Sequence, residues 1–193
     1  VMNRIGTIDT TMDSLRVIKC DAENFADGSL LSTDGKYDFQ GKDFLSDKFS
    51  HSGKYSLQLD PTNQYGFGFH LLLNKGRHYE ISAWRKSDCG KGVIAANGPN
   101  FYASSVPTGE KTNDGWEKVS VKFQLPQNYS ESSIQVFAWN ESGNQTTYFD
   151  DFIMRAMPMW WGIMIRLWET MESSLSCVLV FCVLQSVPSG IRH

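Results

Sequence analysis

The sequence has few cysteines and no excess of basic residues. Its 193 residues include four cysteines, and the net charge at pH 7 is −3. Cys20 and Cys89 stand alone while Cys177 and Cys182 are neighbours, and this spacing matches neither a zinc site nor a small disulfide framework. Lys and Arg are scattered, so no basic surface is expected and nucleic acid is excluded as the expected partner.

Catalytic patterns are also missing. The sequence has no Gly-x-Ser-x-Gly motif, and its four histidines form no metal-ligand spacing. A glycosidase needs two carboxyl groups that face one cleft, but the glutamates fall in separate predicted strands and turns: Glu80, Glu110, Glu117, Glu131 and Glu141. The sequence therefore predicts a protein that is not an enzyme.

Length and composition divide the chain into three parts. One well-buried core is the expectation for 193 residues. We assign residues 17–157 to one domain, residues 1–16 to a lead-in or the end of a preceding domain, and residues 158–193 to an atypical tail. Residues 1–11 lack a basic segment followed by an apolar run, so no signal peptide is recognised.

The middle of the chain alternates with the period of β-strands. The clearest segments are 65–71, 79–85, 118–123 and 134–139. In the first, strict alternation places Tyr65 on the same face as Phe67, Phe69 and Leu71. In the second, it places Trp84 on the face opposite the core. Each segment is expected to be a half-buried strand.

The connections between these segments have turn composition. Asn or Asp occurs with Gly at 74–76, 88–90, 97–99, 113–115 and 142–144. Turns that follow single strands, without helical periodicity between them, favour antiparallel strands in two packed sheets. We therefore predict an all-β fold, an antiparallel jelly-roll β-sandwich followed by an atypical hydrophobic C-terminal tail.

Four segments resemble a known family. They are 51–59 (HSGKYSLQL), 75–84 (KGRHYEISAW), 115–121 (GWEKVSV) and 148–152 (YFDDF). In this order they resemble the strand signatures of carbohydrate-binding modules of the family 4, 9 and 22 type, which have the galactose-binding-like β-sandwich fold. The resemblance covers about residues 17–157. It implies a polysaccharide or oligosaccharide partner, other domains in a larger chain, and an extracellular, periplasmic or cell-surface location.

The same resemblance implies a structural calcium ion between the N-terminal segment and the last strand. The matching positions are Glu23, with Asp21 as a contributor, and Asp150 or Asp151, aided by carbonyl oxygens near residues 52–54. Calcium takes about 6 to 8 oxygen ligands, and such a set is suitable. The alternative is that Asp150 and Asp151 are an exposed acid and a hydrogen-bonded acid at a strand end.

Sugar binding requires flat aromatic faces flanked by polar side chains. Trp84 is the first candidate, because alternation places it opposite the core, and Trp139 with Gln135 and Phe137 offers a second platform. Nearby contacts are expected from Arg85, Asn140, Phe101 and Tyr102. The alternative for each aromatic is burial in a core, since sandwiches bury aromatics.

The tail differs in composition from the rest of the chain. Residues 158–193 hold three of the six tryptophans, two of the four cysteines and only four charged residues. A membrane anchor is one interpretation, but the apolar centre at 178–184 is far shorter than the ~20 residues of a spanning helix. An amphipathic helix at 160–171 that docks on the sandwich is a second. We favour the third, a reading-frame slip after the last strand.

These observations predict a non-catalytic carbohydrate-binding module that attaches a larger protein to a polysaccharide or glycan. The alternative is a structural or adhesive β-sandwich that spaces domains or contacts protein. A weaker interpretation is an accessory domain of a membrane enzyme, in which the tail is the anchor. A sugar binder should expose at least two aromatics on one face near polar side chains, whereas a spacer should bury them.

Overall fold

A computed structural model describes residues 6–7, 17–86, 91–131, 133–141 and 145–157. Among these residues the regular structure is almost entirely β, with a single short 3-10 helix at Lys42–Phe44. Every pairing between named strands is antiparallel except that of β1 with β8. The predicted all-β, antiparallel sandwich is confirmed. The interpretations of the tail fall on residues 158–193, which lie outside the described residues.

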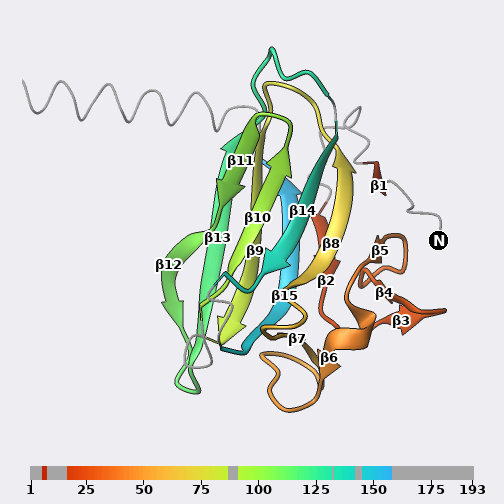
Figure 1. Ribbon diagram of the computed structural model, residues 1–193, viewed down its shortest axis with the longest axis vertical. Coiled ribbons are helices and arrows are strands. Elements are labelled where there is room, and N and C mark those ends of the chain that lie inside the picture. Colours follow the sequence, from red (N-terminus) through yellow and green to blue (C-terminus); the bar gives the residue numbers. More distant parts are fainter. Residues whose placement is uncertain (1–5, 8–16, 87–90, 132, 142–144, 158–193) are drawn as a thin grey trace, which may run out of the picture. The chain divides into compact units, whose positions relative to one another are not determined.

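Two sheets lie face to face (Figure 1). The five-stranded sheet has the order β1 (Gly6–Thr7), β8 (Tyr65–Leu72), β14 (Ser133–Trp139), β10 (Val93–Gly98) and β11 (Phe101–Ser104). The seven-stranded sheet has the order β12 (Val106–Lys111), β13 (Trp116–Gln124), β9 (His78–Lys86), β15 (Thr147–Ala156), β7 (Ser56–Leu59) and β6 (Leu45–Ser46), with β2 (Val17–Cys20) also paired to β15. A small sheet of β3 (Phe25–Ala26), β4 (Ser29–Leu31) and β5 (Asp38–Phe39) lies beside them.

The core fills the space between the two sheets. Alternate residues of β9, such as Tyr79 and Ile81, are fully buried, and Val136 of β14 lies in the same apolar cluster. Removing such side chains from water is the main favourable term in folding, about 1.5–3 kcal/mol for each large one. The predicted alternation of β9, β13 and β14 is thus the pattern that forms this core.

One strand departs from strict alternation. Pairing of β8 with β14 shifts by one residue between Val136 and Ala138, and Phe67 has a left-handed backbone with φ of 46°. This is a β-bulge, which adds a residue to one strand and reverses the faces beyond it. Phe67, Phe69 and Leu71 are buried as predicted, but Tyr65 is 55% exposed. Its predicted inward position was wrong because of the bulge.

A second bulge lies in β15. Its pairing with β9 shifts between Asp150 and Ile153, and Asp151 has φ of 48°. The two aspartates therefore do not point to strictly opposite faces, as neighbours in a regular strand would.

Among the described residues, no helix is long and apolar enough to cross a membrane.

Candidate binding face

The outer face of the five-stranded sheet carries a cluster of aromatic rings. Trp139 of β14 is paired directly with Tyr65 of β8, and their rings are nearly parallel, with centroids 6.2 Å apart and an angle of 7°. Phe137 meets the Tyr65 ring by its edge at 5.6 Å. Side chains of directly paired residues stand on the same side of a sheet. The bulge in β8 thus assembles an aromatic platform from Tyr65, Phe137 and Trp139.

A row of polar side chains crosses the same face. Tyr102 of β11 is paired with Asn97 of β10, Asn97 with Gln135 of β14, and Gln135 with His70 of β8. Tyr102 is 55% exposed, and Asn97 is exposed as well. Gln135 and Trp139 are four positions apart, so at about 3.3 Å per residue the row lies ~13 Å from the Trp139 end of the platform. Amides and hydroxyls can both donate and accept hydrogen bonds.

The loop before the 3-10 helix adds one further amide to this face. The N–H of Gln40 donates to the carbonyl of Gly68 at 3.0 Å. A Cβ at Gly68 would lie 2.5 Å from Gln40 Oε1, so the absence of a side chain at Gly68 is what lets the amide lie over β8. We name the platform, the polar row and Gln40 together the binding face.

The described strand positions on the whole outer face of the five-stranded sheet, which include the binding face, carry no Asp, Glu, Lys or Arg. From register, these positions are Tyr65, Gly68, His70, Leu72, Val93, Ala95, Asn97, Tyr102, Ser104, Ser133, Gln135, Phe137 and Trp139. Such a surface offers stacking and uncharged hydrogen bonds and lacks the groups of a two-carboxylate catalyst. Such a face can stack on apolar C–H surfaces and form hydrogen bonds with uncharged polar groups.

Four of the predicted ligand residues share this face: Tyr102, Gln135, Phe137 and Trp139. Sequence reasoning did not select Tyr65, His70, Asn97 or Gln40. The short run Val93–Gly98 could have been recognised as a strand, since it forms β10, and Asn97 could then have been assigned to a sheet face. Tyr65 was assigned to the core because its strand was treated as regular.

Trp84 lies on the other sheet. It is half-buried on the outer face of β9, and the His51 ring stacks on it with centroids 4.1 Å apart and an angle of 12°. Lys118 Nζ lies 6.0 Å from the centroid of the Trp84 ring. The structure thus does not bring Trp84 and Trp139 together, and the Trp84 ring is engaged by the side chains of its own chain.

The remaining three predicted contacts point into the fold. Arg85 donates to the carbonyl of Gly92 and pairs with Glu117. Phe101 packs against the rings of Phe123 and Tyr129.

Asn140 is also taken up by the fold and is fully buried. Its amide donates to the carbonyls of Leu59 and Gln145, and it accepts from the hydroxyl of Thr147 at 3.2 Å. A buried amide whose groups are bonded to its own chain holds the end of β14 in place.

The predicted metal ligands of β15 hold a loop. Asp150 Oδ2 accepts the N–H groups of His51 and Ser52 at 2.8 and 3.0 Å, and Asp150 Oδ1 accepts the N–H of Asp151. Asp151 lies 2.6 Å from His51 Nδ1 and accepts the Ser52 hydroxyl at 2.8 Å. Burial raises the pKa of Asp150 to about 7, although the N–H donors oppose the rise.

Glu23 holds the other end of the same loop. Its Oε1 accepts the N–H groups of Lys54 and Tyr55 at 2.7 and 2.6 Å. Asp21 is turned toward its own segment, where it accepts the N–H of Glu23 and the hydroxyl of Thr33, both at 3.2 Å. We name the loop 51–55 with Glu23, Asp150 and Asp151 the clasp.

In the clasp, backbone N–H groups of the loop donate to the carboxylates of Glu23 and Asp150. The family resemblance implies carbonyl oxygens near residues 52–54 in their place, and an N–H group repels a cation. Calcium takes about 6 to 8 oxygen ligands, but among the described residues no three His, Cys, Asp or Glu side chains gather as a metal site. Calcium binding stays a prediction.

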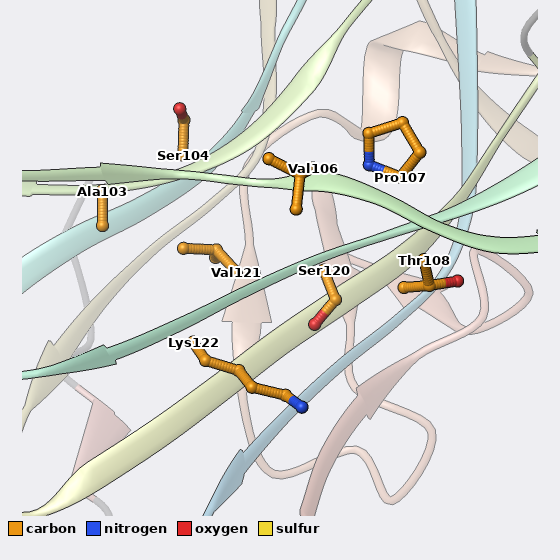
Figure 2. Close-up of a pocket in the computed structure, with 8 residues that line it drawn as sticks. All are labelled: Ala103, Ser104, Val106, Pro107, Thr108, Ser120, Val121 and Lys122. Carbon is orange, nitrogen blue, oxygen red and sulfur yellow. The ribbon is translucent and has the colours of Figure 1, made fainter. Parts of the chain in front are cut away.

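A groove of about 600 Å³ lies along β11, β12 and β13, where the chain crosses from one sheet to the other. Figure 2 shows Val106 and Val121 on its walls, with Pro107 and Lys122 also lining it. Val106 is 65% exposed. None of the residues predicted as sugar contacts lines this groove, and it is separate from the aromatic platform.

No protein-family profile matches the sequence, and no curated protein sequence matches it. Among solved structures, the CBM22-1 xylan-binding domain from Paenibacillus barcinonensis Xyn10C is 19% identical, with a TM-score of 0.43 over 58% of this chain and 78% of that chain. A family 16 carbohydrate-binding module is 18% identical, with a TM-score of 0.41 over 57% and 82%. A Stig cyclase from Fischerella sp. TAU is 10% identical, with a TM-score of 0.43 over 74% and 84%.

The similarity to carbohydrate-binding modules, which the sequence motifs predict, thus recurs among solved structures. Cyclases are similar to this chain as well, so these similarities do not distinguish a binding role from a catalytic one.

Proposed function

We propose that this domain is a non-catalytic carbohydrate-binding domain that binds a polysaccharide or oligosaccharide on its binding face. The observation that carries the proposal is the pairing of Tyr65 with Trp139, two aromatic rings on one face beside a row of amides and hydroxyls. Pyranose rings present C–H surfaces to aromatic faces, and their hydroxyls pair with amide groups. The exposed aromatics Tyr65 and Tyr102, which lie on one face with polar side chains, support a sugar binder over a spacer.

The binding face also favours binding over hydrolysis. Glycoside hydrolysis needs two carboxyl groups about 5 to 10 Å apart beside the scissile bond, and the described strand positions of this face include no carboxylate. The proposed role is to attach a larger protein to a glycan, in an extracellular, periplasmic or cell-surface setting. The structural or adhesive role is the competing proposal.

The proposal is tested by affinity electrophoresis of the full chain against a panel of polysaccharides. Tyr65→Ala and Trp139→Ala are each expected to weaken retention about tenfold or more, since truncation of an aromatic anchor costs more than ~1.4 kcal/mol. Phe25→Ala is the matched control, because Phe25 is an exposed aromatic of β3 away from the binding face. It should leave retention unchanged.

Two results would contradict the proposal. If the folded wild-type domain is retained by no polysaccharide, the structural or adhesive role becomes the better one. If retention occurs but survives both aromatic substitutions, the glycan binds elsewhere on the molecule.

A further inference from the structure

The binding face depends on one irregular residue in β8. Phe67 has φ of 46°, a left-handed conformation that is rare for a bulky side chain. Two residues of β8, Phe67 and Gly68, oppose the single residue Phe137 of β14, because the pairs Val136 with Phe69 and Ala138 with Gly66 enclose them. Such residues persist only where the surrounding structure holds them, and they cluster at functional sites.

A regular strand would not build the platform. Without the extra residue, alternation would turn Tyr65 away from Trp139 and toward the core. The inward position beside the bulge is occupied by Gly66, where an added Cβ would lie 2.3 Å from Leu57 Cδ2. No side chain fits at this position. The glycine there therefore allows both the bulge and the close packing of Leu57.

The ring of Phe67 anchors the bulge to the core. Phe67 is fully buried, and its ring contacts Phe152 of β15 with centroids 5.5 Å apart and Phe39 of β5 at 6.4 Å. These contacts tie the irregular residue to the opposite sheet and to the small sheet. The favourable burial of an aromatic ring offsets the unfavourable backbone conformation.

We propose that Phe67 is a positioning residue, which holds Tyr65 beside Trp139 and so determines the aromatic platform on which a glycan stacks. This inference rests on the proposed function for its role in binding, but the placement of Tyr65 can be measured without any ligand. Phe67 itself touches no glycan, since it lies in the core.

The test compares two substitutions of equal volume. Phe67→Ile introduces a β-branched side chain, which resists left-handed backbone, whereas Phe67→Leu is unbranched at Cβ and serves as the matched control. Both lose the ring contacts, so both should unfold at lower denaturant concentration than the wild type. Two-dimensional NMR reports NOEs between the Tyr65 and Trp139 rings, and affinity electrophoresis reports glycan retention.

We expect Phe67→Ile to lose the Tyr65–Trp139 NOEs and to weaken retention about as much as Tyr65→Ala, on the order of tenfold. Phe67→Leu should keep both the NOEs and the retention, because a side chain unbranched at Cβ resists the left-handed backbone less and still fills the buried position of the ring. Loss of the NOEs in both variants would also support the positioning role and assign it to the aromatic ring. A folded Phe67→Ile protein that keeps the NOEs overturns the inference.

The wild-type protein provides a second measurement in case Phe67→Ile does not fold. A left-handed residue gives a strong NOE between its own amide and α protons, and Tyr65 should show NOEs to Trp139. If the wild-type spectrum lacks either the strong amide–α NOE of Phe67 or the NOEs between Tyr65 and Trp139, the inference is overturned without any variant. If wild type binds no glycan but shows both NOEs, the proposed function fails while the positioning of Tyr65 by Phe67 stands.

Discussion

At the scale of single residues, the two outward tryptophans have different surroundings. Trp84 stacks on His51, so it packs against the clasp, while Trp139 belongs to the aromatic platform. Trp84→Ala is therefore expected to lower the free energy of unfolding by about 1–3 kcal/mol and to leave glycan retention unchanged. Denaturant unfolding and affinity electrophoresis of the same variant measure the two effects. Lost retention at unchanged stability would move the glycan site to the seven-stranded sheet.

Asp150 is expected to make stability depend on pH. Burial raises its pKa from 3.8 to about 7 in the folded protein, so the folded state binds more protons than the unfolded state between these values. Stability should then fall as pH rises through this window, by at most about 4 kcal/mol for a shift of about three pKa units. Chemical denaturation at a series of pH values from about 5 to 8 measures it.

Asp150→Asn is the control for this pH dependence, because an amide does not ionise. The variant should show a flatter profile than the wild type. For Glu80 and Glu117, burial opposes the change in pKa, but hydrogen bonds from Arg155 and Arg85 lower their pKa values from 4.5, which is already below the measured range of about pH 5 to 8. If the two profiles have the same slope, Asp150 does not titrate in this range.

At the scale of elements, the clasp joins the N-terminal segment to β15 through the loop 51–55. Because N–H donors already satisfy Glu23 and Asp150, we expect the clasp to hold without calcium. EDTA should leave the melting temperature within about 1 °C of its value in buffer, since a ligand stabilises only if it binds the folded state. A fall of several degrees that calcium restores would instead establish the ion that the family resemblance implies.

Whether an element can be predicted from the sequence depends on whether local residues or distant ones determine it. The alternation of β9, β13 and β14 is local, so these strands and the shared face of Gln135, Phe137 and Trp139 were accessible from the sequence. The bulge at Phe67 was not, because Gly66 and Gly68 leave the alternation intact in the sequence and only the packing of distant side chains against them fixes the register.

The burial of polar groups could not be predicted from the sequence for the same reason. Asn140 has the composition of an exposed sugar contact, but it is buried because carbonyls and a hydroxyl from residues up to 81 positions away satisfy its amide. Such partners are set by tertiary structure and not by spacing. The resemblance implies that the carboxylates of the clasp meet residues 52–54, but whether the loop offers carbonyls or N–H groups there depends on its backbone conformation.

At the scale of the whole molecule, the two outer faces differ in charge. The described strand positions of the binding face carry no Asp, Glu, Lys or Arg, whereas the outer face of the seven-stranded sheet carries Lys118, Lys122 and Arg155 with their acidic partners Glu80 and Glu110. Salt screens interactions between exposed charges but leaves stacking and uncharged hydrogen bonds nearly unchanged.

Glycan binding should therefore be almost independent of ionic strength. From about 0.05 to about 0.5 M salt, over which the Debye length falls from ~14 to ~4 Å, we expect the affinity of the full chain for a neutral polysaccharide to stay within about twofold. Isothermal titration calorimetry at several salt concentrations measures this, with Phe25→Ala as a variant whose affinity should follow the wild type. A steep fall in affinity with salt would mean that charged side chains carry the binding, and it would favour a site on the seven-stranded sheet beside Trp84, where Lys118, Lys122 and Arg155 lie.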